Sequence, residues 1–156
     1  MVELFKPNAA NFVPLSPLSF LSRTAAIFPD RVAVRYGARA HTWAQVQDRA
    51  QRLAGALQAA GVKEGHVVSL IMANTPEMIE AHYGVPLSGA ILNTINVRLE
   101  PETLAYILDH AETKVLITDT AFAPAVREAL AKTKNRNVQV IDVVDPAVPG
   151  LSLIHI

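Results

Sequence analysis

The chain has 156 residues, of which 51% are hydrophobic and none is cysteine. This length and composition suffice for a buried core, and they exclude a disordered protein, a disulfide-stapled domain and a thiolate zinc site. The 14 basic residues balance the 14 acidic ones, so the chain lacks the basic surface of a protein that binds nucleic acid or anionic membrane. We therefore expect small molecules or other proteins as partners.

The N-terminal segment has the features of neither a signal peptide nor a membrane span. Its opening, MVELFKPNAANFVPLSPLSFL, contains one lysine and several prolines that interrupt the apolar residues. Both a signal peptide and a spanning helix need a longer uninterrupted apolar run. We expect a soluble, cytoplasmic protein with no membrane span.

The first third of the chain predicts two helices separated by a hairpin. Ser16 followed by Pro17 offers an N-cap and a first helical position, and Pro29 ends that helix. The runs RVAVRY and ARAHTW around Gly37 predict two short strands joined by a tight turn. Thr42 with Gln45 has the spacing of a capping box, which opens the second helix.

The second helix is predicted to end at Gly61, a residue type favoured at helix C-termini. Trp43 is predicted to pack the first turn of this helix onto the sheet. The apolar residues at helical spacing are Val46, Ala50, Leu53, Ala54 and Leu57.

From residue 67 onward, apolar runs alternate with helical segments, as parallel βαβ units require. Helices are predicted to begin at Pro76, Pro101 and Thr120, and Pro86 is predicted to bend or shorten the first of them. The sequence thus predicts an α/β fold with a mostly parallel sheet of βαβ units and flanking helices. The four predicted strand runs are VVSLIM, AILNTI, KVLIT and VQVIDVV.

Several segments together resemble the N-terminal region of AMP-forming acyl-CoA synthetases over residues 11–150. In chain order they are TWAQ, RLA, GVKEG, NTPEM, SGAILNTINVRL, LAYILDH and KVLITD. The opening NFVPLSPLSFLSRTAAIFPDR is similar to a branch with short- and medium-chain fatty acyl, benzoate-type and methylmercaptopropionate CoA ligases. The resemblance implies an incomplete N-terminal subdomain of the adenylate-forming fold.

The resemblance also predicts the domain organisation. Residues 1–150 are expected to be the N-terminal part of the large AMP-binding domain. Residues 151–156, LSLIHI, resemble the translation of a transposase sequencing adapter. We expect this tail to be an artefact and the natural chain to continue beyond Gly150.

The resemblance implies a two-step ligase reaction for the full-length parent. A carboxylic acid attacks ATP to give an acyl-adenylate, and coenzyme A then displaces AMP. Such chemistry needs a phosphate-binding loop, Mg²⁺ and a cationic group near the reacting phosphorus. The sequence has no Ser/Thr/Gly-rich loop ending in Pro-Lys-Gly, no GxxxxGK and no GxGxxG. In the family these parts lie downstream, so we expect this chain alone to be inactive, without catalytic or metal-binding residues.

One residue matches a ligand-binding position of the family. Arg98, in NVRL, matches an arginine that contacts a phosphate of coenzyme A in some of these ligases. It follows the run AILNTI, and the carboxyl ends of parallel strands carry the ligand-binding loops of open α/β sheets. The alternative is a surface arginine paired with Glu100 or Glu102, which contributes at most about 1 kcal/mol.

Three asparagines near predicted strand ends have two interpretations. The amides of Asn93 and Asn96 either orient a ligand or Arg98, or they satisfy backbone groups as turn residues do. The turn role is favoured for both. For Asn74 it is favoured more strongly.

The histidines and the C-terminal cations favour structural roles. His41, His66, His82 and His110 fall on different elements without zinc-ligand spacing. His66 replaces an aspartate common in the family, and His82 with Tyr83 is predicted to form a buried, hydrogen-bonded pair. The basic residues near the end of the last helix are predicted to offset its dipole and solvate the loop rather than to bind phosphate. They are Lys132, Lys134 and Arg136.

A second class of function stays open, namely a self-contained, non-enzymatic α/β binding or interaction module. A coding frame that continues past Gly150 favours the ligase, whereas a native stop codon after Ile156 favours the module. A homodimer of the full-length parent is a further option.

Overall fold

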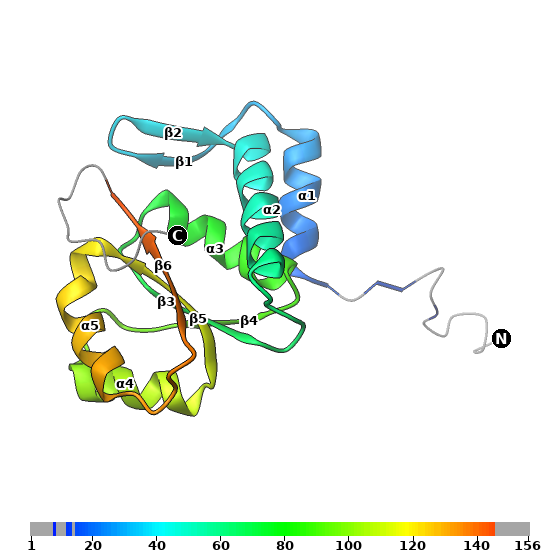
Figure 1. The fold of residues 1–156 in the computed structure, drawn as a ribbon. Coiled ribbons are helices and arrows are strands. Elements are labelled where there is room, and N and C mark those ends of the chain that lie inside the picture. Colours follow the sequence, from blue (N-terminus) through cyan, green and yellow to red (C-terminus); the bar gives the residue numbers. More distant parts are fainter. Residues whose placement is uncertain (1–7, 9–11, 14, 146–156) are drawn as a thin grey trace.

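The computed structural model describes residues 8, 12–13 and 15–145 (Figure 1). Residues 146–150 and the adapter-like tail at 151–156 lie outside the described residues. None of the described helices is long and apolar enough to span a membrane.

The N-terminal elements form as predicted. Helix α1 spans Pro17–Ile27, and its N-cap hydroxyl, Ser16 Oγ, accepts a hydrogen bond from Leu18 N at 3.3 Å. Strands β1 (Val32–Tyr36) and β2 (Arg39–Thr42) pair antiparallel. The predicted hairpin is therefore confirmed.

Helix α2 spans Trp43–Ala59 and begins with the predicted capping box. Gln45 N donates to Thr42 Oγ1 at 3.3 Å, and Thr42 N donates to Gln45 Oε1 at 2.8 Å. Two backbone donors of the first turn are thereby satisfied by side chains. The helix is followed by Gly61 at φ +85°, a left-handed conformation that glycine adopts without steric cost.

The main sheet is entirely parallel, in the order β4-β3-β5-β6. All four predicted strand runs are confirmed, and with them the α/β fold. The strands are β3 (Val67–Ile71), β4 (Ile91–Thr94), β5 (Thr113–Asp119) and β6 (Gln139–Val143).

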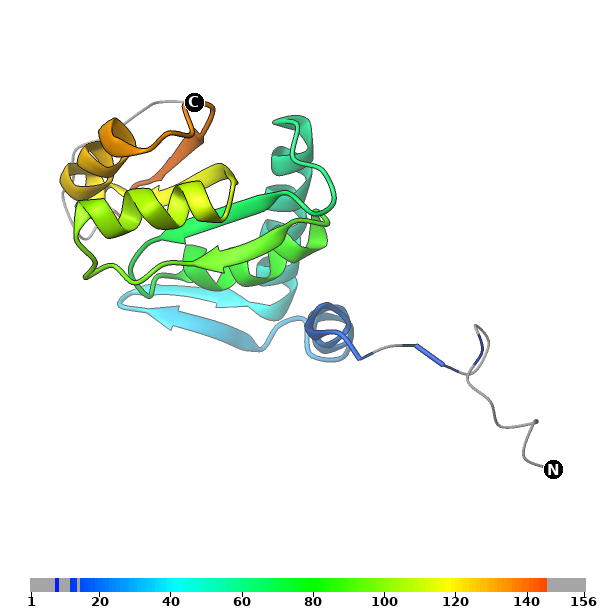
Figure 2. The same ribbon diagram turned by 90° about the horizontal axis from the view of Figure 1, so that it is seen from below.

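Helices cover both faces of this sheet. Helices α2 and α3 (Pro76–Leu87) pack on one face, while α4 (Pro101–His110) and α5 (Ala123–Lys132) pack on the other. Figure 2 shows α4 and α5 side by side on one side of the strands and the hairpin on the opposite side. The helix starts at Pro76 and Pro101 are confirmed, whereas Thr120 opens a 3-10 turn, η2 (Thr120–Phe122), before α5.

Helix α3 continues through Pro86 and ends one residue later. The next amides bond back into the last turn, with Ser88 N donating to Gly84 O at 3.1 Å and Gly89 N donating to Pro86 O at 3.0 Å. Pro86 thus lies in the last turn of the helix, where its missing N–H removes one helical hydrogen bond and only one more helical residue follows.

Besides the apolar cores on the two faces of the sheet, a third apolar cluster joins α1, α2, α3 and the hairpin. Trp43 packs against the buried residues Leu21, Val46 and Ala50 of this cluster. Its predicted core role is confirmed, but its neighbours are helices and the hairpin rather than the parallel sheet. The reason is that the hairpin and α1 lie beyond α2 and α3, outside the sheet's own layers (Figure 1).

Candidate functional site

The strand order places a topological switch point between β3 and β5. The chain leaves β3 towards β4 on one side and returns to β5 and β6 on the other. Open α/β sheets bind ligands outside the carboxyl ends of the strands at such a point. The loop after β3, at residues 72–75, and the turn η2 after β5 flank this position.

The hairpin is tied across this end of the sheet by two side-chain contacts. Tyr36 Oη donates to Asp145 Oδ2 at 2.7 Å, and this hydrogen bond raises the pKa of Tyr36. The Arg39 guanidinium binds the carboxylate of Glu77 in the first turn of α3. The hairpin therefore restrains both the start of α3 and the residue just beyond β6.

Arg98 lies in the loop between β4 and α4, on the carboxyl side of the sheet. Its backbone N–H donates to Asn96 Oδ1 at 3.0 Å, while Ile95 N continues the strand pairing to Leu70 O at 2.9 Å. Val97 and Leu99 pack against the core under α4. Because Val97 and Leu99 face the core, Arg98 between them faces outward and is exposed.

The structure does not support the surface ion pair considered for Arg98. Glu102 binds Lys132 instead, and within residues 15–145 no carboxylate lies in ion-pair range of Arg98. The guanidinium has several directed N–H donors suited to phosphate. A fixed loop thus presents an uncompensated cation beside the sheet edge where ligands are expected.

The two asparagines of this region play different roles. Asn96 acts as the predicted turn residue, because its side-chain oxygen accepts from Arg98 N. Asn93 lies within β4, and its amide donates to Ser69 Oγ at 3.0 Å, which in turn lies 2.7 Å from Thr113 Oγ1. The prediction of a turn role for Asn93 is wrong, since its amide bonds the hydroxyl of Ser69 on β3, the adjacent strand.

A surface hollow beside α3 brings together Asn74, His82 and Tyr83. Asn74 is exposed and makes no side-chain hydrogen bond with the described residues, so its predicted turn role is not seen; Thr75 is the N-cap. The prediction of a buried His82–Tyr83 pair is also wrong. His82 is exposed, and its Nδ1 lies 2.8 Å from Met78 O. Tyr83 instead packs against the third apolar cluster, which joins α1, α2, α3 and the hairpin.

His66 forms a local side-chain hydrogen bond in the turn before β3. Its Nδ1 accepts from Lys63 N at 3.2 Å, in the turn before β3. A carboxylate at this position would accept the same bond. The imidazole therefore supplies a hydrogen-bond acceptor to this turn.

Among the cations near the end of α5, Lys132 is held by carboxylates. Lys132, in the last turn of α5, binds Glu102 and Glu128, and both contacts raise its pKa. The Asp109 carboxylate binds the Thr133 hydroxyl and accepts from Lys134 N at 3.0 Å. These contacts agree with the predicted structural role for Lys132, whereas the exposed side chains of Lys134 and Arg136 pair with no carboxylate in the described part of the chain.

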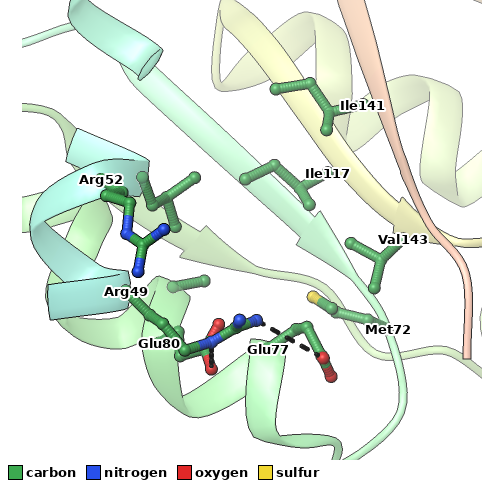
Figure 3. Close-up of a pocket in the computed structure, with 10 residues that line it drawn as sticks. Arg49, Arg52, Met72, Glu77, Glu80, Ile117, Ile141 and Val143 are labelled. Carbon is green, nitrogen blue, oxygen red and sulfur yellow. Dashed lines mark hydrogen bonds and ion pairs between the residues drawn. The ribbon is translucent and has the colours of Figure 1, made fainter. Parts of the chain in front are cut away.

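A groove of about 250 Å³ lies between α2, α3 and the last two strands (Figure 3). Its floor is apolar and includes Met72, Ile117, Ile141 and Val143. Charged side chains of the two helices line its rim, namely Arg49, Arg52, Glu77 and Glu80.

Most rim charges are already paired with one another. Arg49 binds Glu80 through Nε, and its Nη2 lies 3.8 Å from Glu77 Oε1. Burial alone would raise the pKa of Glu77, but the hydrogen bond from Arg39 and smaller contributions outweigh it, so that pKa is lowered. Neither the network nor the groove was predicted from the sequence. The i, i+3 spacing of the two glutamates and of the two arginines was a signal, but it did not indicate which helices face each other.

No group of three or more His, Cys, Asp or Glu side chains in the described part of the chain is arranged to hold a metal ion. The Arg98 loop offers a ligand an unpaired cation, and the groove offers it an apolar floor.

Comparison with protein families matches residues 21–152 to the AMP-binding enzymes. The chain belongs to the AMP-binding enzyme family. It is 46% identical over 121 residues to the peroxisomal butyrate–CoA ligase of Arabidopsis thaliana, covering 78% of this chain and 21% of that enzyme. It is 40% identical over 130 residues to the 2-methylpropanoate–CoA ligase of Humulus lupulus, covering 83% of this chain and 23% of that enzyme.

Solved structures of this family share the fold. A benzoate CoA ligase from Burkholderia xenovorans superposes with a TM-score of 0.78 over 87% of this chain and 27% of its own, at 24% identity. A Mycobacterium tuberculosis fatty acyl CoA synthetase superposes with a TM-score of 0.75 over 81% of this chain and 26% of its own, at 28% identity. The predicted adenylate-forming fold of this AMP-binding family member is therefore confirmed. The chain spans about a fifth to a quarter of the length of the curated relatives it matches.

Proposed function

We propose that this chain is the N-terminal part of an AMP-forming acyl-CoA ligase. The 46% identity to a butyrate–CoA ligase over 78% of the chain carries the proposal. The doubly wound sheet and the cationic loop at its carboxyl edge agree with it. The alternative of a non-enzymatic module has no comparable observation in its favour.

In this proposal the whole enzyme activates a carboxylic acid with ATP and transfers the acyl group to coenzyme A. The present residues supply scaffold and a coenzyme contact, while the phosphate-binding loop, the Mg²⁺ site and the cationic group near the reacting phosphorus come from other sequence. The 156-residue chain alone is then inactive.

Within the whole enzyme, Arg98 binds a phosphate of coenzyme A. Its exposure and its lack of a carboxylate partner among the described residues support this role. The bond between Asn96 and the backbone of Arg98 fixes the loop that presents the guanidinium. A preorganised loop lowers the entropy lost on binding.

The acid is proposed to be short or medium in length. The two relatives described above are named for butyrate and 2-methylpropanoate, both short aliphatic acids. Localisation in the cytoplasm stays a prediction, and the relatives of Arabidopsis thaliana named peroxisomal offer a second compartment to test.

The test is a ligase assay on the protein encoded by the complete reading frame that contains this chain. Butyrate, 2-methylpropanoate and benzoate are supplied with ATP, Mg²⁺ and coenzyme A, and AMP release is measured. Arg98→Ala should raise the KM for coenzyme A by about tenfold, the usual effect of losing one charge-assisted hydrogen bond. Arg127→Ala, at an exposed arginine of α5, is the control and should leave that KM unchanged. Absence of AMP formation with all acids would refute the proposal.

A further inference from the structure

The turn between α2 and β3 is closed by two hydrogen bonds between the same two residues. His66 N donates to Lys63 O at 3.0 Å, and Lys63 N donates to His66 Nδ1 at 3.2 Å. The first bond is the ordinary bond of a β-turn, and Gly65 at its third position has φ +80°, as a type II turn requires. The second bond depends on the imidazole, so closure of this turn involves a titratable side chain.

Only the neutral form of His66 can accept this second hydrogen bond. An imidazole nitrogen accepts through its lone pair, so Nδ1 carries no proton and the ring holds its single proton on Nε2. In the imidazolium both ring nitrogens are donors. The N–H at Nδ1 would then face the N–H of Lys63, so protonation removes the bond and sets two donors against each other.

The same turn joins β3 to the start of β4. Gly65 N donates to Gly89 O at 3.0 Å, and Ile91 N donates to His66 O at 2.8 Å. Both bonds lie at the amino ends of the two strands, away from the Arg98 loop at the carboxyl end of β4. A change in the turn therefore acts first on the pairing of β3 with β4 at this end of the sheet.

We propose that the turn from Lys63 to His66 is an acid-sensitive device, closed when His66 is neutral and opened when its imidazole is protonated. Histidine side chains ordinarily change charge between about pH 5 and 8. Because the closed turn needs the neutral ring, the stability that it contributes is present at the alkaline end of this range and is lost as the pH falls. The device needs neither ATP nor coenzyme A, so it is independent of the proposed ligase activity.

The surroundings of His66 offer the imidazolium no compensating carboxylate. The charged residues in the turn and at the adjacent start of β5 are Lys63, Glu64, Glu112 and Lys114. Within residues 15–145, no carboxylate lies in ion-pair range of His66. The end of α2 (residues 57–60) and the turn before β4 (residues 88–90) carry no charged side chain. The closed turn thus contains no ion pair that would hold a protonated ring in place.

His82 is the internal contrast to His66. Its Nδ1 lies 2.8 Å from Met78 O, and because a carbonyl oxygen only accepts, this nitrogen is the donor. Protonation of His82 adds a proton at Nε2 and keeps the bond. Acid should therefore open the turn at His66 and leave the His82 contact in α3 intact.

Hydrogen–deuterium exchange of the full 156-residue chain tests the proposal. Exchange is read by mass spectrometry on peptides that cover residues 61–66 between about pH 8 and 5.5, and each rate is divided by the intrinsic amide rate at that pH. Protection of these peptides should fall by about fivefold to tenfold over the range, the effect of losing one hydrogen bond. Peptides from β5 report global unfolding and should keep their protection.

Two variants separate the imidazole from the rest of the turn. His66→Asp should remove the pH dependence, because an aspartate side chain stays an acceptor down to about pH 4. His82→Gln is the matched control and should show the same fall in protection at residues 61–66 as the wild type.

The proposal is overturned if wild-type protection at residues 61–66 is the same at both ends of the pH range. It is also overturned if His66→Asp loses protection in acid as the wild type does. An equal loss in the β5 peptides would replace local opening of the turn by unfolding of the whole domain.

Discussion

At the scale of single residues, the ion pair between Arg49 and Glu80 is the contact whose loss should matter most. Glu80 is 6% exposed, and Arg49 is its ion-pair partner. Arg49→Met would leave a buried carboxylate without its cation, at a cost between that of exposed and of fully buried pairs. We expect the free energy of unfolding to fall by about 1–3 kcal/mol in urea titrations.

Arg52→Met is the matched control for this substitution. Arg52 lies one turn along the same helix and binds the exposed Asp48. Exposed pairs of this kind contribute about 0.5 kcal/mol or less. Equal losses for the two variants would show that burial of Glu80 is not what makes the Arg49 contact important.

Asp109 should make stability depend on acid pH. The Thr133 hydroxyl and the amides of Lys134 and Asn135 bind its carboxylate and lower its pKa from the ordinary value of 3.8. A lowered pKa means that the folded state favours the charged form. The stability that the charged Asp109 carboxylate contributes is therefore present above pH 3.8 and is lost as the pH falls through the lower folded-state pKa.

Asp109→Asn tests this dependence. The variant should be less stable than the wild type at neutral pH, and the difference should shrink as the pH falls below about 4. Urea unfolding at a series of pH values measures the difference. A difference in the free energy of unfolding between the two proteins that stays constant down to the lowest pH would argue against a charged Asp109 as the cause.

At the scale of elements, the crossing of α2 and α3 depends on Gly84. A Cβ at this position would lie 2.8 Å from Leu53 Cδ2 and 2.9 Å from Ala50 O. The backbone oxygen cannot rotate away as a side chain can, so Gly84→Ala must move the helices apart. We expect a loss of about 1–3 kcal/mol in thermal or urea unfolding.

Gly55→Ala separates packing from helix propensity. Gly55 lies in α2 with no atom within 4 Å of the position a Cβ would take. There alanine should stabilise the protein by up to about 1 kcal/mol, because it favours helix more than glycine does. Stabilisation by both substitutions would contradict the close approach at Gly84.

Local signals explain why most elements were predictable. Thr42 with Gln45, and the prolines at 76 and 101, each determine a helix start through contacts within a few residues. The predicted side-chain roles of Asn93 and His82 were wrong because these roles depend on which strand or helix lies alongside. The Arg49 network and the groove are non-local in the same sense, since the groove residues come from the loop after β3, from β5 and β6, and from two helices.

At the scale of the whole molecule, exposed apolar surface should limit solubility. The two outer strands carry exposed apolar side chains, with Ile91 55% and Val144, just after β6, 63% exposed. Unpaired strand edges with apolar faces promote aggregation. We predict that residues 1–150 expressed alone are poorly soluble, as measured by the soluble fraction and by light scattering. A monodisperse sample that unfolds cooperatively would contradict this prediction.

The central claim is that these residues begin an AMP-forming acyl-CoA ligase, and the most direct measurement is the sequence of the source DNA across the codon for Gly150. It should be read with a method that uses no transposase adapter. The account predicts an open frame that leads into a Ser/Thr/Gly-rich loop ending in Pro-Lys-Gly. A native stop codon directly after Ile156 would contradict it and leave a small α/β domain without ligase chemistry.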